Sequence, residues 1–412
     1  MEYVILGAGA AGITAAKTIR KADKNGKITV ISTDTQVHSR CMLHKYLSHE
    51  RDAAGISFVD PDFFEKNQIT WLQGKTVNRL DTQGKKVYTD QGDEVSYDRL
   101  LIATGAESFI PPVGNLREAE NVFGLRHLRD AQAIDELAKN AENIVIIGSG
   151  LVGLDAAYGL METGKKVSIV EMADQILPVQ LDKTAAFEYQ KRFEEAGARF
   201  YLGRKAADTI MGEDKNIHEI VLDNGEKLAC DLIIVAAGVR SAVAGMEGEG
   251  IVIDRGIKVD DYLQTGAEGV YAAGDVTGLS GIWPNAQKQG ETAALNMCGS
   301  HVEYTDRYAI KNTINFFGLV SMCVGVILPQ EGDVVIARED SRNYKRVVLR
   351  DEKVVGVLLQ GDISHGGIWQ YLTKNQISIS GIQKDIFDLN FGDFYGIKDN
   401  GEYQWRMKAI SR

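Results

Sequence analysis

The sequence predicts an α/β protein built on parallel sheets, and three observations predict this class. An apolar strand, the pattern Gly-x-Gly-x-x-Gly and a helix follow one another at residues 3–20, and the same order recurs at residues 143–163. A second apolar strand follows each copy, at 27–32 and 166–170, as in a βαβ unit. Apolar strands that end in small residues lie at 98–105 and 231–240. Alternating strands and helices favour parallel sheets covered by helices.

Length, charge and cysteine usage narrow the class of protein. The chain has 412 residues, enough for two or three domains. Its net charge of −11 disfavours nucleic acid and anionic membranes as partners, because both bind basic patches. No apolar run approaches the ~18 residues of a membrane span, and the first strand starts at once, so we expect a cytoplasmic protein without a signal peptide. The four cysteines form no Cys-x-x-Cys pair, so we expect no metal site and no disulfide.

The first glycine-rich turn, Gly7-Ala8-Gly9-Ala10-Ala11-Gly12, is predicted to bind a pyrophosphate. Its first glycine permits the turn, its second lets a phosphate approach the backbone, and its third lets helix and strand pack closely. An acid normally follows the next strand and binds ribose hydroxyls. Ser32 and Thr33 stand there instead, so Asp34, 22 residues past Gly12, is the candidate. A solvated loop aspartate is the alternative.

The second glycine-rich turn, Gly148-Ser149-Gly150-Leu151-Val152-Gly153, repeats the pattern more completely. The strand after it ends in Glu171, 18 residues past Gly153. A carboxylate at this place would accept hydrogen bonds from ribose hydroxyls and repel a 2′-phosphate, and residues 172–175 offer no arginine to bind one. The sequence therefore predicts two bound nucleotides, with NADH preferred over NADPH at the second turn.

Other segments follow in order and complete the predicted fold. Residues 85–97 carry the pattern of a β-hairpin, and the strands at 98–105 and 231–240 end in Ala103-Thr104-Gly105 and near Gly238. A further strand ends in Gly274-Asp275, where the carboxylate could bind cofactor hydroxyls. Pro284 suits the start of a helix that runs to residue 297. Strands at 345–350 and 354–359, joined by a turn, indicate a C-terminal region of alternating strands and turns.

Taken in this order, the motifs resemble those of the pyridine nucleotide–disulfide oxidoreductase superfamily. The matching segments are Gly7–Gly12, Ala103–Gly105, Gly148–Gly153 with Glu171, Ala237–Val239 and Ala272–Asp275. The resemblance implies FAD at the first turn and at Gly274-Asp275, and NAD(H) at the second turn. It also implies an FAD-binding domain at 1–111 and 235–308, an inserted NAD(H)-binding domain at 112–234, and a C-terminal α+β domain at 309–412.

Two local motifs resemble NADH:rubredoxin oxidoreductases, ferredoxin reductases and the flavin part of assimilatory nitrite reductases. Those relatives show Arg-Pro-x-Leu-Ser-Lys and Trp-Pro-x-Ala-x-x-Gln-Gly, and this chain has Arg40-Cys41-Met42-Leu43-His44-Lys45 and Trp283-Pro284 with Gln289-Gly290. In the relatives a lysine at the position of Lys45 lies near flavin N5 and pairs with an acid at the position of Asp155. The resemblance therefore implies hydride transfer from NADH to FAD and electron transfer to a rubredoxin- or ferredoxin-type protein. The helix after Pro284 would present its N-terminus to the flavin.

Two other functions stay open at this stage. Cys41 replaces the proline of the relatives and lies near the redox cysteine of NADH oxidases, peroxidases and coenzyme A–disulfide reductases, although it could also be an inert buried residue. Tyr46 stands where a dithiol partner would lie, so Cys41 would act alone. Alternatively, the chain is a flavin subunit of a larger complex. An acidic electron acceptor would need a basic patch, for which the candidates are Lys311, Lys345 and Arg346, and self-association is left open.

Overall fold

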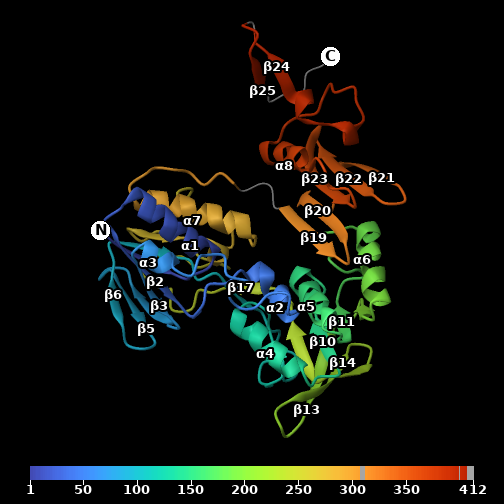
Figure 1. Cartoon of the computed structure of the whole chain (residues 1–412), viewed down its shortest axis with the longest axis horizontal. Coiled ribbons are helices and arrows are strands. Elements are labelled where there is room, and N and C mark those ends of the chain that lie inside the picture. Colours follow the sequence, from blue (N-terminus) through green and yellow to red (C-terminus); the bar gives the residue numbers. More distant parts are fainter. Residues whose placement is uncertain (307–310, 399, 406–412) are drawn as a thin grey trace. The chain divides into compact units, whose positions relative to one another are not determined.

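The computed structural model describes residues 1–306, 311–398 and 400–405, and the chain divides into two compact units (Figure 1). The first unit comprises Met1–Met172 and Ala198–Arg307, and the second comprises Ala173–Gly197 and Tyr308–Arg412. Residues 173–197 thus group with the C-terminal unit, although the predicted boundaries put them in the NAD(H)-binding domain. Those domain boundaries therefore stay a prediction.

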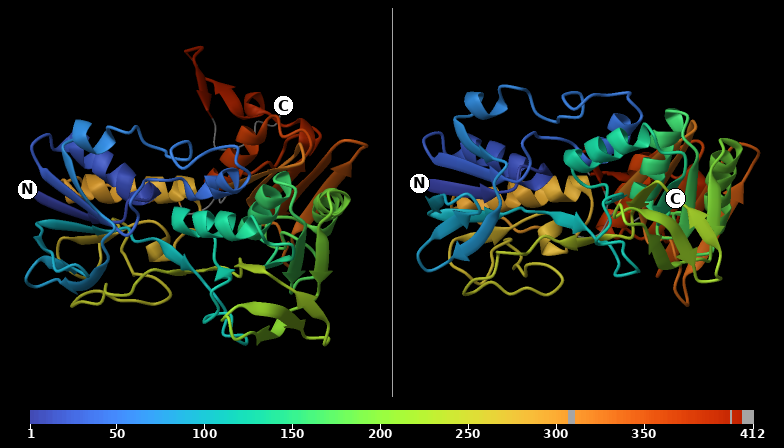
Figure 2. Two further views of the ribbon diagram at one scale, coloured as in Figure 1. Left: turned by 60° about the horizontal axis from the view of Figure 1, so that its bottom comes forward. Right: turned by 90° about the horizontal axis from the view of Figure 1, so that it is seen from below.

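The first unit contains a five-stranded parallel sheet built around the N-terminal strand. Its strands lie in the order β18 (Val270–Ala272), β7 (Arg99–Ile102), β1 (Glu2–Leu6), β2 (Lys27–Ser32) and β3 (Ile69–Gln73). Alternate residues of β1 face opposite sides, so Tyr3 and Ile5 join one core while Val4 and Leu6 join another. Helices α1 (Ala10–Ala22) and α7 (Trp283–Met297) lie side by side and contribute to the first of these cores (Figures 1 and 2).

Close packing of α1 against α7 depends on Gly290. A Cβ atom at Gly290 would lie 2.2 Å from the Ala11 carbonyl oxygen, so Gly290→Ala should push the helices apart. We expect this substitution to lower the free energy of unfolding by about 2–3 kcal/mol in urea titrations. The exposed Lys288→Ala change on the same helix is the control and should cost less than about 0.5 kcal/mol. Equal effects of the two changes would contradict the close contact.

A second parallel sheet in the same unit repeats the order of four strands of the first, but its fifth strand precedes these four in the chain instead of following them. Its strands are β12 (Arg199–Leu202), β11 (Val167–Glu171), β10 (Ile144–Ile147), β16 (Leu232–Val235) and β9 (Val122–Phe123). Helix α5 (Leu151–Glu162) follows the central strand β10 as α1 follows β1, and α4 (Leu128–Ala138) precedes it. The two predicted Rossmann-like units are therefore confirmed, with the second inserted in the chain between β7 and β18.

Smaller antiparallel sheets complete the first unit. One consists of β4 (Val77–Asp81), β5 (Lys86–Thr89) and β6 (Glu94–Ser96), which confirms the predicted hairpin. Another consists of β13 (Ala206–Met211), β14 (Ile217–Leu222) and β15 (Lys227–Ala229). Where the chain leaves the first sheet and later returns to it, β8 (Ala106–Ser108) pairs with β17 (Val239–Ser241). Short helices α2 (Leu43–Leu47) and α3 (Phe63–Lys66) lie between β2 and β3 in sequence.

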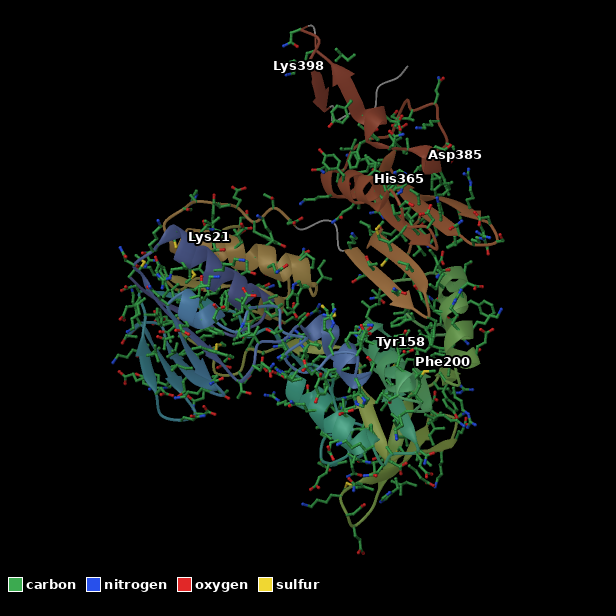
Figure 3. All side chains as sticks on the ribbon, viewed as in Figure 1. Lys21, Tyr158, Phe200, His365, Asp385 and Lys398 are labelled. Carbon is green, nitrogen blue, oxygen red and sulfur yellow. The ribbon has the colours of Figure 1, made fainter. Side chains whose placement is uncertain are left out.

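The second unit contains an antiparallel sheet with a helix from the middle of the chain. The Tyr189 hydroxyl of α6 (Lys183–Glu195) donates a hydrogen bond to the Leu319 carbonyl at 2.9 Å and lies 3.2 Å from the Ile314 carbonyl. Asp385, labelled in Figure 3, forms an ion pair with Arg338. The strands of this sheet lie in the order β19 (Lys311–Phe316), β20 (Leu319–Gly325), β23 (Lys353–Gln360), β22 (Tyr344–Arg350) and β21 (Val334–Glu339). Further along the chain follow α8 (Gly366–Asn375) and the antiparallel pair β24 (Tyr395–Ile397) and β25 (Tyr403–Trp405). The two predicted C-terminal strands are therefore confirmed.

Two features expected from the sequence can be compared with the structure: a basic patch that includes Arg346, and the character of the helices. Arg346 is largely buried and forms an ion pair with Asp182 at 3.3 Å, so its assignment to an exposed basic patch was wrong. Its guanidinium also donates to the Ile327 carbonyl at 2.9 Å, so the side chain is held by contacts within this unit. Among the described residues, no helix combines the length and the apolar character that crossing a bilayer requires.

Candidate cofactor-binding and redox site

The first glycine-rich turn has the backbone geometry of a phosphate cradle. Gly7 has φ +110°, and a Cβ there would lie 2.2 Å from the Ala103 carbonyl oxygen. A Cβ at Gly12 would lie 1.9 Å from the Gly7 carbonyl oxygen, so the helix and the turn are in direct contact. At Gly9, by contrast, a Cβ would meet no protein atom within 4 Å. The open space therefore lies at Gly9, directly before the N-terminus of α1, where an anion is stabilised.

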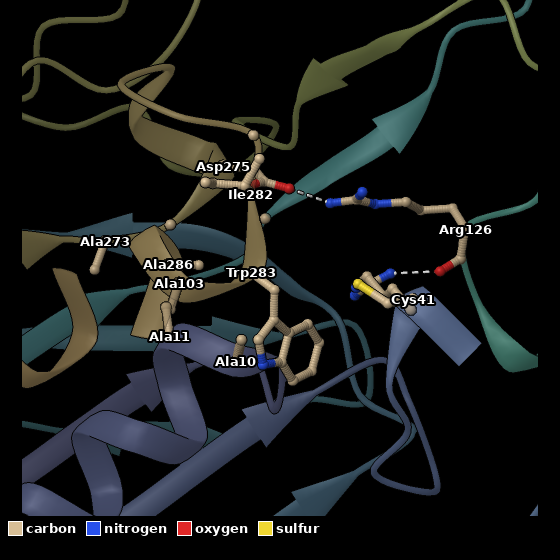
Figure 4. Close-up of a pocket in the computed structure, with 15 residues that line it drawn as sticks. Ala10, Ala11, Cys41, Ala103, Arg126, Ala273, Asp275, Ile282, Trp283 and Ala286 are labelled. Carbon is tan, nitrogen blue, oxygen red and sulfur yellow. Dashed lines mark hydrogen bonds and ion pairs between the residues drawn. The ribbon is translucent and has the colours of Figure 1, made fainter. Parts of the chain in front are cut away.

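Two cavities extend from this turn and share Gly9, Arg40 and Ala103 in their walls. The larger, of about 400 Å³, is also lined by Gly7, Asp34 and Thr104. The smaller, of about 80 Å³, is lined by the remaining predicted residues Ala10, Ala11, Cys41, Gly105, Gly274, Asp275 and Trp283 (Figure 4). Predicted site residues from six separate segments thus meet along one continuous surface. The predicted site residues Gly12 and Pro284 do not line either cavity.

Asp34 lies in a partly buried network of charged side chains. Its carboxylate is 3.0 Å from His127 Nδ1 and 3.6 Å from Arg40 Nη2, and His127 Nε2 is 3.0 Å from the Glu107 carboxylate. Because carboxylates only accept hydrogen bonds, a protonated His127 ring can donate to both of them, and Arg40 Nη1 also lies 3.3 Å from Nδ1. Burial disfavours this charge, but the hydrogen bonds to Asp34 and Glu107 outweigh it and raise the pKa of His127. Against the opposing effect of burial, His127 and Arg40 lower the pKa of Asp34 to about 2.

Arg126 and His127 are site residues that the sequence patterns did not reveal. Arg126 forms an ion pair with Asp275 in the smaller cavity and also donates to the Ala106 carbonyl (Figure 4). Both residues lie in the loop between β9 and α4, outside every motif. Spacing in sequence carries no signal for such residues, since their partners are brought close only by the fold. Nearby, His38 donates to the Gln36 carbonyl oxygen and accepts from Leu128 N–H, so its ring is held by the backbone.

The predicted pair between Lys45 and Asp155 is replaced by two other contacts. Lys45 Nζ lies 2.5 Å from the Glu50 carboxylate, and Asp155 lies 3.8 Å from His44 Nδ1. Side-chain length explains the change of partner: aspartate is one methylene shorter than the glutamate of the relatives, and the turn after α2 brings Glu50 next to Lys45. Burial raises the pKa of Asp155 to about 7, with Lys45 opposing, and burial followed by Lys45 lowers the pKa of His44 to about 4.

Cys41 is exposed and lines the smaller cavity, so the alternative of an inert buried cysteine is wrong (Figure 4). Desolvation of the thiol, followed by the negative charge of Asp155, raises the pKa of Cys41. Because the thiolate is the nucleophilic form, this environment disfavours thiol chemistry at neutral pH. The other cysteines are buried, except Cys298, which is partly buried.

Helix α7 presents its N-terminus at the wall of the same cavity. Pro284 occupies the first turn of the helix, and no acidic side chain offsets the positive end of its dipole. Gln289, fully buried, accepts a hydrogen bond of 2.8 Å from Gly274 N–H, while its Nε2 has no hydrogen-bond partner among the described residues. Gln289 therefore orients the Gly274-Asp275 turn from inside the fold.

The second glycine-rich turn repeats the geometry of the first. Gly148 has φ +104°, and a Cβ there would lie 2.5 Å from the Ala236 carbonyl oxygen. A Cβ at Gly153 would lie 2.0 Å from the Gly148 carbonyl oxygen, whereas Gly150 faces open space. Leu151 and Val152 begin α5, and Gly238, with φ +103°, follows β16. Two turns of the same design therefore exist in one unit, each suited to a pyrophosphate.

Comparisons with known proteins agree with this geometry. The family model "Pyridine nucleotide-disulphide oxidoreductase" matches residues 1–290, and "Rubredoxin NAD+ reductase C-terminal domain" matches residues 311–377. The chain is 30% identical to nitrite reductase [NAD(P)H] of Bacillus subtilis (strain 168) over 93% of this chain and 48% of the relative, so it spans about half of that protein. It is also 30% identical to NADH-dependent phenylglyoxylate dehydrogenase subunit epsilon of Aromatoleum evansii, over 92% and 93% of the two chains.

A solved structure extends the agreement to the fold as a whole. The crystal structure of NADH:rubredoxin oxidoreductase from Clostridium acetobutylicum matches with a TM-score of 0.76 and 25% identity, over 93% of this chain and 97% of that one. The family model alone covers more than half of the sequence. The chain therefore belongs to the pyridine nucleotide–disulphide oxidoreductases, a family whose cofactors are the predicted FAD and NAD(H).

Proposed function

We propose that this chain takes a hydride from NADH onto FAD and passes the electrons to a small redox protein or a partner subunit. The observation that carries the proposal is the pair of glycine-rich turns with matching geometry, one opening onto the joined cavities and the other lying beside Glu171. FAD, when bound, supplies the step from two-electron hydride chemistry to single-electron release. No metal ion in this chain is required for that conversion.

The residues around the cavities fit an FAD molecule. The turn at Gly9 and the N-terminus of α1 would hold the pyrophosphate, and Asp34 would accept hydrogen bonds from ribose hydroxyls in the larger cavity. Gly274 and Asp275 would hold the ribityl chain beside Trp283. The positive end of α7 would stabilise negative charge on the nearby ring system.

Lys45 and Asp155 are the proposed catalytic residues on the nicotinamide side. Lys45 supplies a cation, held by Glu50, that favours negative charge on the reduced cofactor. Asp155, whose pKa lies at about 7, can hold or release a proton at neutral pH. The NAD(H)-binding segment in this proposal is 112–234, the FAD-binding segments are 1–111 and 235–308, and the C-terminal segment is 309–412.

The names of the relatives support a role as one part of a larger electron-transfer system. One relative is named as a subunit of a dehydrogenase and matches over nearly its full length, and another is a nitrite reductase of twice the length. A third is named for its use of rubredoxin. We therefore include a partner subunit as acceptor on equal terms with a free rubredoxin- or ferredoxin-type protein. A cytoplasmic location and any self-association stay predictions.

Anaerobic titration of the flavin-loaded full chain with NADH tests this function. We expect one NADH to bleach one flavin, and rubredoxin or ferredoxin to restore the oxidised spectrum much faster than oxygen does. Absence of bleaching by NADH would contradict the hydride step. Bleaching of the flavin by NADH, followed by slow reoxidation with every soluble carrier, would indicate that the electron acceptor is a partner subunit.

A thiol-dependent oxidase or reductase is the second candidate, favoured by the position of Cys41 in the wall of the smaller cavity. The raised pKa of the Cys41 thiol argues against it. We therefore expect Cys41→Ser to change turnover with a protein acceptor less than about twofold, and the thiol count to stay constant on reduction. Cys298→Ser, a change of the same type at a partly buried site, is the control. A loss of activity confined to Cys41→Ser would instead support the thiol mechanism.

A further inference from the structure

We propose that Ser149 is a positioning residue that sets the nucleotide preference of the second turn by holding the Glu171 carboxylate. This inference rests on the proposed binding of NAD(H) at that turn. It concerns a position that the pattern Gly-x-Gly-x-x-Gly leaves unspecified, between the first two glycines. What is new is therefore a role for the variable side chain of the motif.

The contacts that carry the inference are two hydrogen bonds to one oxygen. Ser149 N–H donates to Glu171 Oε2 at 2.8 Å, and Ser149 Oγ donates to the same atom at 2.9 Å. Ser149 is completely buried, whereas Glu171 is partly exposed at the carboxyl end of β11. Two donors from a rigid, buried turn fix both the place and the direction of the carboxylate.

The first glycine-rich turn provides a natural comparison within the same chain. Leu6 pairs with Ile31 in the first sheet, as Ile147 pairs with Val170 in the second. Counting on from these pairs, Ala8 corresponds to Ser149, and Ser32 corresponds to Glu171. The first copy thus has no acid at the end of the strand and no hydroxyl between the first two glycines, whereas the second copy has both. This joint difference indicates that the hydroxyl serves the acid rather than the turn, which forms equally well with alanine.

The position of the carboxylate decides which ribose the site accepts. A fixed carboxylate at the strand end accepts a hydrogen bond from a 2′-hydroxyl and repels a 2′-phosphate by like charge. A glutamate held only by the backbone N–H has more freedom to rotate toward solvent, which would relieve the repulsion. Loss of the Ser149 hydroxyl should therefore weaken the discrimination between NAD+ and NADP+ more than it weakens the binding of NAD+ itself.

The test is calorimetric binding of NAD+, NADP+ and adenosine-2′-deoxy-NAD+ to the oxidised, flavin-loaded full chain. For Ser149→Ala we expect the ratio of the NADP+ and NAD+ dissociation constants to fall about three- to tenfold, and the preference for NAD+ over its 2′-deoxy analogue to fall as well. Glu171→Gln should lower the first ratio by more than tenfold. Thr163→Ala removes a hydroxyl that bonds to the Leu160 carbonyl at 2.7 Å beyond α5, and it should change neither ratio.

The outcomes separate this inference from the assignment of the site. Unchanged ratios in Ser149→Ala, with altered ratios in Glu171→Gln, would overturn the role of Ser149 alone. Unchanged ratios in both variants would overturn the NAD(H) assignment of the turn and the inference with it. Ser149→Gly, which keeps the N–H donor and removes the hydroxyl, gives the same comparison if the alanine variant fails to fold, and thermal unfolding monitors each variant.

Discussion

Gly9→Ala is expected to fold like the parent chain and to bind FAD about tenfold to a hundredfold more weakly. Gly9 has φ −83° and ψ −169°, which alanine adopts without strain, and its Cβ would meet no protein atom within 4 Å. The added methyl would instead occupy the space where a pyrophosphate approaches the backbone. The measurement is the flavin-to-protein ratio after dialysis, with urea unfolding of the apoprotein alongside.

Two other glycines give matched controls for this prediction. Gly12→Ala places a Cβ 1.9 Å from the Gly7 carbonyl oxygen, so it should lower the free energy of unfolding by about 3 kcal/mol or more. Gly150→Ala has the same open surroundings as Gly9 but lies in the second turn, so it should weaken nucleotide binding and leave flavin content unchanged. Full flavin retention in Gly9→Ala would show that the pyrophosphate binds elsewhere.

His127→Gln should be the most damaging polar substitution in the cofactor-binding region. The change removes the cation that lies 3.0 Å from Asp34, and the side chains of His127 and Asp34 are only 4% and 14% exposed. Asp34 would then keep only Arg40, at 3.6 Å, as a cationic neighbour, so the substitution should cost about 1–3 kcal/mol of unfolding free energy at neutral pH. Glu107 is half exposed, so the loss of its contact adds little. Flavin retention should fall in parallel, because Asp34 lines the larger cavity.

The same contact predicts a definite pH dependence. The pKa of His127 is raised in the folded chain, so its stabilising effect is complete below the ordinary histidine value of ~6.5 and is lost as pH rises through the raised pKa. The pKa of Asp34 is lowered to about 2, so its contribution is present above ~4 and is lost as pH falls toward 2. Unfolding free energies of the parent and His127→Gln should therefore converge at alkaline pH. A difference that stays constant up to alkaline pH would contradict a charged His127.

The sequence predicted the parts of the fold that are encoded locally. Each glycine-rich turn combines a tight turn with close packing at fixed spacing, so the strands and helices around Gly7 and Gly148 could be assigned from the local sequence pattern. The strand ends near Ala103 and Gly274 were recognisable because small residues allow a close approach to a ligand. These elements supply part of the walls of the two cavities.

The parts that could not be predicted depend on contacts between distant segments. Arg126 reaches Asp275 from a loop that no motif marks, and His127 reaches Asp34 in the same way. The partner of Lys45 was mistaken because the length of a side chain and the path of a short turn decide between Asp155 and Glu50. Helix α6 lies between β11 and β12 in sequence, yet its buried face packs in the C-terminal unit.

The pairing of β18 with β7 has a consequence for the order of folding during synthesis. Val270 pairs with Leu100, and all strands of the second sheet lie between these two residues in the sequence. Strand β7 therefore remains an edge strand until residues 270–272 leave the ribosome. The inserted sheet needs nothing beyond Val235 and can form earlier. Closing so long a loop is slow, and an exposed strand edge invites aggregation in the meantime. Ribosome-bound chains that end before β18 should therefore contain the second sheet but retain no flavin.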